Sequence, residues 1–416
     1  RVSLRITVVE SPRKIRRWAI TAVKVLVVVE IAWLVVVNSL LYWPLTQTVI
    51  NGIRPEKFQV HWGSAWSWYP GRIRVEDALA NGNAARQMWQ VEVESVSGSV
   101  AFLPLLLKRV WISDVSGLNV EFRQRPRPQA DRDYSRIERF FPEIDGREVT
   151  PALPLPQRRW PWRVAIDDMR IAGKLDYWIY QLRGSAEGSG RVELEYRSSG
   201  GPLELDVSEI DLALGPHWIE GDRQVFPEGQ VSGTLGFLPF RPRENRGWTM
   251  LEYLVVDLGL DVELNSLKFI DAFLLNFPGI TVDGHGQVSG QLNFAQGTVL
   301  PGTDLSVQAG RLELDAQGYR INGEGEVKLA MGPGTGGNMD RVFDYGALEV
   351  GPPGENAPML TGDGLLIKVG GDGNVLPRDE GFNPSREVGL EIGRLAVPDL
   401  ASYQRFLPKK WPVTLL

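Results

Sequence analysis

An apolar stretch from Trp18 to Trp43, interrupted at Lys24, Glu30 and Asn38, constrains this chain more than any other feature. At a rise of about 1.5 Å per residue, its length of about 26 residues lets one helix cross a hydrocarbon layer of about 30 Å. Basic residues cluster just before it, at 13–17, and no comparable cluster follows it. Because positively charged flanks stay in the cytoplasm, we expect a cytoplasmic N-terminus and place the remaining chain across the membrane.

A cleaved signal peptide and a buried helix of a soluble protein are the two alternatives for this stretch. Signal peptides have a shorter apolar region and a cleavage site of small residues, whereas this stretch is closed by Tyr42, Trp43 and Pro44. Aromatic residues at both ends suit the two membrane interfaces. A buried soluble helix would not need the basic flank. We therefore interpret the stretch as a retained, single-pass membrane anchor.

The polar residues within the predicted span leave two interpretations open. A carboxylate near the middle of a bilayer is costly, so Glu30 is expected to face a partner or water. In the first interpretation Glu30, with Lys24 or Asn38, contacts a second membrane protein. In the second, Glu30 is protonated and tolerated in a very apolar helix, while the Lys24 side chain reaches the cytoplasmic interface.

Beyond Pro44 the dominant pattern is alternation of apolar and polar residues, which is typical of strands with one buried and one wet face. A spacing of about eight to ten residues with glycine between segments predicts consecutive antiparallel hairpins. The 45 glycines and 14 tryptophans agree with a mainly β, turn-rich fold. The clearest segments are 58–62, 72–75, 90–94, 117–122, 162–167, 191–196, 203–207, 230–235, 286–294, 304–307, 311–314, 319–323, 325–329, 365–369 and 388–397.

Four segments depart from the alternation. Residues 123–163 are rich in proline and arginine and predict an extended, partly mobile connector. Its arginines either contact anionic lipid head groups or belong to a solvated linker with intermingled acidic residues. Residues 264–277 have apolar positions three and four apart and predict a short helix. Residues 332–358 and 370–385 are rich in glycine and proline and are predicted to be loops.

A weak internal repeat links two of the predicted strands. Gly229–Leu235 returns with one change as Gly286–Leu292, a pattern that also arises by chance in a glycine-rich β-protein. The abrupt end and the absence of an initiator methionine lead us to expect a piece of a longer protein. The predicted organisation is a cytoplasmic basic tail (1–17), a transmembrane helix (18–43), a first β-region (44–122), the connector (123–163) and a second β-region (164–416).

Composition and motifs exclude several function classes. The net charge is −6 and no run of lysine and arginine is interleaved with aromatic residues, so nucleic acid is not an expected partner. The chain has no cysteine, which excludes disulfides and thiolate metal sites. The histidines, His61, His217 and His285, stand outside any nucleophile-elbow or zinc-binding motif. We therefore predict neither catalytic residues, nor a metal, nor a cofactor.

The order of several segments resembles the beginning of AsmA-like proteins of Gram-negative envelopes. After the anchor come Trp68–Asp77, Val91–Glu94, a leucine-rich turn and Val110–Leu118; segments 284–290, 297–307 and 319–327 are also similar to this family. The resemblance is spread over most of the chain and includes no catalytic motif. It implies a curved antiparallel β-sheet forming an elongated hydrophobic groove, an inner-membrane anchor, a periplasmic β-region, and phospholipid movement between inner and outer membranes.

The alternation also supplies candidate groove residues. Apolar side chains expected on one face, able to shield acyl chains, are Val192, Leu194, Tyr196, Leu203, Leu205, Leu312 and Leu314. The same alternation fits the closed core of a β-sandwich or barrel. Expected partners are phospholipids, the inner membrane and a second membrane protein at the helix. The alternative function is a tethered β-scaffold of an envelope complex without lipid transfer, and the scarcity of histidine disfavours a third class, a periplasmic hydrolase.

Overall fold

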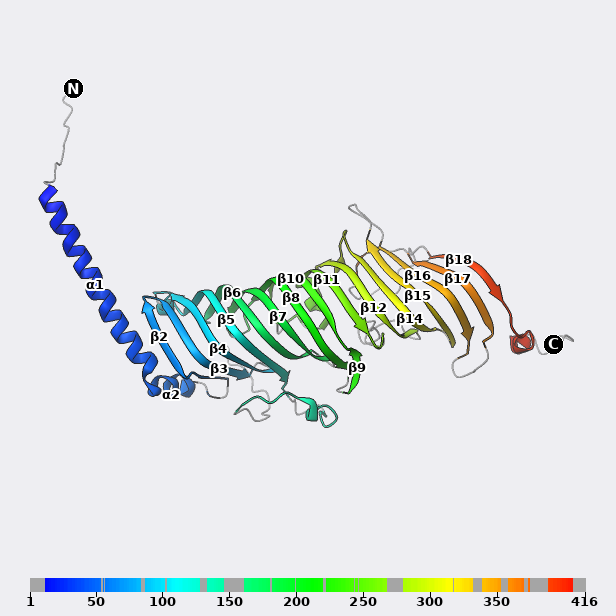
Figure 1. Cartoon of the computed structure of the whole chain (residues 1–416), viewed down its shortest axis with the longest axis horizontal. Helices are drawn as coiled ribbons and strands as arrows, with labels where there is room; N and C mark the ends of the chain where they lie inside the picture. The colour runs from blue at the N-terminus through cyan, green and yellow to red at the C-terminus, as the bar shows by residue number, and fades with distance from the viewer. Residues whose placement is uncertain are drawn as a thin grey trace, which may run out of the picture.

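The computed structural model consists of an N-terminal helix followed by one long β-sheet (Figure 1). It describes residues 12–53, 55, 57–83, 87–101, 103–127, 133–145, 161–179, 182–198, 200–219, 222–242, 244–245, 247–267, 280–316, 318–331, 339–352, 358–369, 373–374 and 388–406. The sheet has 18 strands, and its first and last strands lie at opposite ends of the molecule. The predicted mainly β fold with one long apolar helix is confirmed.

Two helices open the described chain. Helix α1 (Pro12–Tyr42) contains a segment of 27 residues, Arg16–Tyr42, that is long and apolar enough to cross a membrane. Helix α2 (Pro44–Ile53) starts at a proline, which suits the first turn of a helix and disfavours helical geometry in the residue before it. The break at Trp43 therefore ends α1 and turns the chain toward the sheet (Figure 1).

The strands are long, and most pair with their neighbours in the chain. In order they are β1 (Phe58–His61), β2 (Ser64–Tyr69), β3 (Arg72–Asn83), β4 (Gln87–Ala101), β5 (Arg109–Pro126), β6 (Arg163–Ile179), β7 (Leu182–Arg197), β8 (Leu203–Ile219), β9 (Arg223–Phe226), β10 (Gly229–Phe240), β11 (Leu254–Leu264), β12 (Ile280–Ala295), β13 (Thr298–Val299), β14 (Asp304–Ala316), β15 (Tyr319–Met331), β16 (Met339–Gly351), β17 (Leu360–Val369) and β18 (Val388–Ala396). Short 3-10 helices are η1 (Leu103–Leu107), η2 (Glu138–Phe140), η3 (Gly247–Tyr253) and η4 (Ala401–Phe406).

The pairing of β5 with β6 is parallel, which departs from the expected run of antiparallel hairpins. A parallel pair requires the chain to return to its starting edge, and the predicted connector makes this return. The register joins Arg109 to Arg163 at one end and Arg123 to Asp176 at the other. The two predicted β-regions are therefore halves of one continuous sheet.

Within the predicted connector, several of the described residues 133–145 contact the sheet. The Asp145 backbone N–H donates to Gln90 Oε1 at 2.7 Å, and Arg125 Nη1 donates to Pro142 O at 3.0 Å. The Phe141 ring meets the Trp178 ring edge-on, with centroids 5.0 Å apart. These contacts are all with strand residues at the end of the sheet where β5 and β6 finish.

Register shifts near the middle of many strands bend the sheet. Several of them coincide with acidic residues of positive φ: Asp114 (50°), Asp168 (51°) and Glu209 (52°). An extra residue on one strand bends it and increases its twist. Because successive strands carry such bulges, the curvature is propagated along the sheet.

The internal repeat noticed in the sequence has a structural counterpart. Gly233 in β10 has φ +131°, and Gly290 in β12 has φ +127°. A Cβ on Gly233 would lie 2.1 Å from Asp257 O, and one on Gly290 would lie 1.9 Å from Asp304 O. Both glycines are therefore required where the backbone of a neighbouring strand approaches closely.

One predicted loop is wrong, and two predicted segments lie largely outside the described residues. Residues 332–358 include β16, whose alternating side chains pair with β15 on one side and β17 on the other. We predicted a loop because glycine and proline are frequent at both ends of this segment, although its central residues alternate between apolar and polar. Of the predicted helix at 264–277, residues 268–277 are outside the described chain, and so is most of the predicted loop at 370–385.

Apolar side chains collect into two buried clusters in the second half of the sheet. The larger includes Leu264, Leu312, Tyr345, Leu348 and Leu365, drawn from β11, β14, β16 and β17. The smaller contains Val256, Phe294, Val299 and Met331, with Leu251 of η3 packed against them.

Candidate functional site

The candidate site is a single apolar face that runs across the sheet. Antiparallel partners share a face, and the register pairs Val192 with Val207, Leu194 with Leu205 and Tyr196 with Leu203. The row continues to Ile166 and Val164 on β6 and to Leu235 and Phe237 on β10. The structure thus brings together five of the seven predicted groove residues: Val192, Leu194, Tyr196, Leu203 and Leu205.

The opposite face of the same strands is charged. Glu193 pairs with Asp206 and Glu195 with Glu204 in the same register. Arg191 Nε lies 2.9 Å from Asp168 Oδ1, which links β7 to the bulge of β6. The sheet is therefore amphipathic, with carboxylates and guanidinium groups on one face and aliphatic side chains on the other.

Accessibility of the apolar face differs between the two halves of the sheet. Val192, Leu194, Tyr196, Leu203 and Leu205 are each only half-buried, as expected for a face that no second layer covers completely. The other two predicted groove residues lie farther along, on β14. Leu312 is 1% exposed and belongs to the larger buried cluster, whereas Leu314 is half-buried. The row on β7 and β8 is thus partly accessible, whereas Leu312 in the second half of the sheet is packed.

Polar groups on the apolar face are paired with each other. His217 is 2% exposed; its Nδ1–H donates to Gly215 O at 2.7 Å, and its Nε2 accepts from the Tyr177 hydroxyl. Burial lowers the pKa of the His217 imidazole, and the hydrogen bond to Gly215 offsets part of this. Burial also raises the pKa of Tyr177 to about 12. A neutral imidazole and a protonated phenol are therefore held together.

The histidines are far from the arrangement that nucleophilic catalysis requires. His61 is exposed in β1 and His285 is exposed in β12, while the His217 ring nitrogens are engaged as described. Within the described residues no group of three or more histidine, aspartate or glutamate side chains could hold a metal ion.

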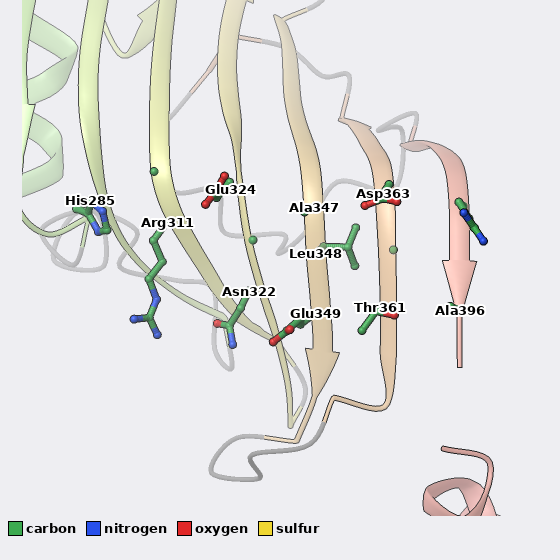
Figure 2. Close-up of a pocket in the computed structure, with 14 residues that line it drawn as sticks. His285, Arg311, Asn322, Glu324, Ala347, Leu348, Glu349, Thr361, Asp363 and Ala396 are labelled. Carbon is green, nitrogen blue, oxygen red and sulfur yellow. The ribbon is translucent and has the colours of Figure 1, made fainter. Parts of the chain in front are cut away.

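A pocket of about 690 Å³ lies farther along the sheet, between β12 and β18 (Figure 2). Its lining includes Asn322, Glu349 and Thr361, which lie opposite one another on three adjacent strands. Arg311 and Asp363 also line it. The pocket lining thus mixes charged side chains of both signs with apolar ones such as Leu348.

The anchor is attached to the sheet by reciprocal asparagine hydrogen bonds that the sequence did not reveal. Asn38 Nδ2 donates to Ser67 O at 2.8 Å, and Ser67 N–H donates to Asn38 Oδ1 at 2.7 Å. Asn51 of α2 does the same with Val60, at 2.9 and 2.8 Å. Asn38 therefore binds β2 of its own chain, and a contact of this residue with a second membrane protein stays a prediction.

The other two polar residues of α1 differ in position. Glu30 is partly covered and lies on the same helix face as Leu34, Val37 and Asn38, which is the face turned toward β2. Lys24 is exposed on α1. A second membrane protein at Glu30 or Lys24 stays a prediction.

Comparison of the chain with protein-family models, curated proteins and solved structures finds no match. The resemblance to AsmA-like proteins stays a prediction. The features that bear on function are therefore the amphipathic sheet and its attachment to a helix long enough to cross a membrane.

Proposed function

We propose that this protein is an inner-membrane-anchored periplasmic lipid carrier whose apolar sheet face holds acyl chains as phospholipids move between inner and outer membranes. The observation that carries the proposal is the half-buried apolar row on β6–β10, which includes Leu194 and Leu205. An uncovered apolar face of this extent marks an interaction site in a protein that is otherwise charged.

The energetics favour acyl chains as the ligand. Each methylene moved from water onto an apolar surface contributes about 0.8 kcal/mol, so a chain needs no specific polar contact. A phosphate head group can stay in water at the rim of the sheet. No bond is made or broken; lipid partitions along the face, and an energised partner or a lipid gradient supplies direction.

Adjacent residues on opposite faces of β7 provide the test. A photocrosslinking amino acid at Leu194 should capture co-purified phospholipid from the full chain in a bacterial membrane, and mass spectrometry would identify the adduct. The same probe at Glu193, the neighbouring position on the charged face, is the matched control. Adducts at Leu194 and few at Glu193 are expected.

Equal, background labelling at both positions would overturn the proposal. Crosslinks from Leu194 to protein alone would favour the alternative, a tethered β-scaffold of an envelope complex whose partner covers the apolar face.

A further inference from the structure

Five exposed apolar side chains lie at the edge of the sheet next to α1. They are Trp68 and Tyr69 at the end of β2, and Leu103, Leu106 and Leu107 of η1, with exposed fractions between 48% and 83%. We call this group the apolar rim. We propose that the apolar rim inserts into the outer face of the bilayer that α1 spans and holds the first strands against the membrane.

The strand register places both parts of the apolar rim on one side of the sheet, where β2 and β4 end. Arg72 at the start of β3 pairs with Ser99 near the end of β4, and Val100 N–H donates to Gly71 O at 2.7 Å. The turn after β2 and the segment after β4 therefore lie side by side. Because η1 follows Ala101, it projects from the sheet at the level of that turn.

Helix α1 shows which way this edge faces. Its Leu41 O accepts a hydrogen bond from Trp62 Nε1, and Asn38 binds Ser67, so α1 runs antiparallel to β2. Toward its N-terminus, α1 continues past the end of β2 (Figure 1). The edge that carries the apolar rim thus points in the same direction as the part of α1 that would cross the membrane.

The length of α1 sets the depth of the apolar rim relative to the membrane. A hydrocarbon layer of about 30 Å takes about 20 helical residues, which, counted from Arg17, reach the level of Val37. Asn38, the next residue, is bonded to Ser67, so Trp68 and Tyr69 come at the membrane boundary. A tilt of α1 lengthens its embedded part and carries the apolar rim deeper.

The composition of the apolar rim fits this position. Tryptophan and tyrosine favour the interface between water and hydrocarbon, and leucine favours the hydrocarbon below it. Exposed Lys108 and Arg109 follow η1 directly, where their charges would meet phosphate head groups. A soluble surface rarely leaves three neighbouring leucines so exposed.

The absence of cysteine makes a depth measurement direct. Leu106→Cys, labelled with an environment-sensitive fluorophore, is placed with the full chain in nanodiscs of phosphatidylcholine containing doxyl-labelled lipid as a quencher. Leu118→Cys is the control, since Leu118 is 62% exposed but lies in mid-β5, nine residues beyond its start at Arg109 and so about 30 Å from η1 at about 3.3 Å per residue. We expect several-fold stronger quenching at position 106 than at position 118.

Equal, weak quenching at the two positions would overturn the proposal, since a rim made for a protein partner would stay in water in nanodiscs that lack that partner. The proposal rests on the membrane anchor of the proposed function and not on lipid transport. A third label, Leu26→Cys in α1, distinguishes failure of the membrane anchor from failure of the apolar rim. Absence of quenching at position 26 rejects the membrane anchor itself. Quenching at 26 without quenching at 106 rejects the apolar rim alone, and neither result bears on crosslinking at Leu194.

Discussion

Replacing Asn38 by leucine should release β2 from the anchor. Asn38 supplies one donor and one acceptor to the backbone of Ser67, which is 4% exposed on an edge strand. Leucine is close in size and suits a membrane helix, so α1 itself should persist. The Ser67 N–H and C=O groups would lose these partners while staying away from water.

The magnitude follows from those two backbone groups. Leaving a buried donor or acceptor without a partner costs about 1–3 kcal/mol, so the pair costs about 2–6 kcal/mol. At about 1.4 kcal/mol per factor of ten, local opening of β2 should become about 30-fold to 10⁴-fold more frequent. Ser39→Ala is the control, because the Ser39 hydroxyl bonds only to Val35 O within the exposed surface of the helix.

Hydrogen–deuterium exchange of the full chain in nanodiscs measures this opening. Amides of β2 (Ser64–Tyr69) should exchange much faster in the Asn38→Leu variant than in the Ser39→Ala variant, while β7 (Leu182–Arg197) is unchanged in both. Identical exchange of β2 in the two variants would refute the reasoning that Asn38 attaches the sheet to the anchor.

Three further changes test the sheet. Gly290→Ala should lower the free energy of unfolding by about 1–3 kcal/mol in thermal denaturation because of its positive φ and crowded Cβ position, whereas Gly389→Ala, whose Cβ meets Lys368 Cβ at 3.6 Å, should not. His217 has a lowered pKa in the fold, so its contribution to stability is present above about pH 6.5 and falls as the pH drops below that value; His217→Gln should abolish this part of the pH dependence in denaturant titrations. Arg183→Ala should expose residues 133–145 to trypsin, because the Arg183 guanidinium carbon lies 4.4 Å from the Phe140 ring centroid and 4.3 Å from that of Trp218; an unchanged cleavage rate would show that this stacking does not hold the connector.

Alternation predicted which side chains share a face wherever a short turn joins two strands. Val192, Leu194 and Tyr196 meet Leu203 and Leu205 because the period of two and the tight β7–β8 connection together fix the register. Alternation could not predict how accessible that face is, since half-buried and fully buried rows have the same pattern. Leu312 and Leu194 look alike in sequence but differ in the structure because only Leu312 is enclosed by neighbouring strands.

Long-range features gave weaker signals. The parallel β5–β6 pair depends on the return of the connector, and the Asn38–Ser67 bonds join residues 29 positions apart. One readable signal was missed. The segments Val75–Ala78, Ile112–Val115 and Ile166–Met169 each place an aspartate of positive φ third, and in the last two this aspartate lies at a register shift. Aspartate tolerates this conformation better than most residues, so its recurrence between apolar positions marks the bends of the sheet.

The division of the apolar face limits how a lipid carrier of this kind would work. An acyl chain entering beside the anchor meets mainly half-buried residues as far as β10, although Val120 and Ile210 are only 6% and 9% exposed. Beyond β11 it meets Leu312 and Tyr345, which are 1% and 0% exposed. Passage farther along the face therefore requires these side chains to separate from their neighbours. The free energy lost when they separate is comparable to the free energy gained when they contact the lipid instead. Under the proposed function, we expect the step from β10 to β14 to slow the movement of lipid along the face.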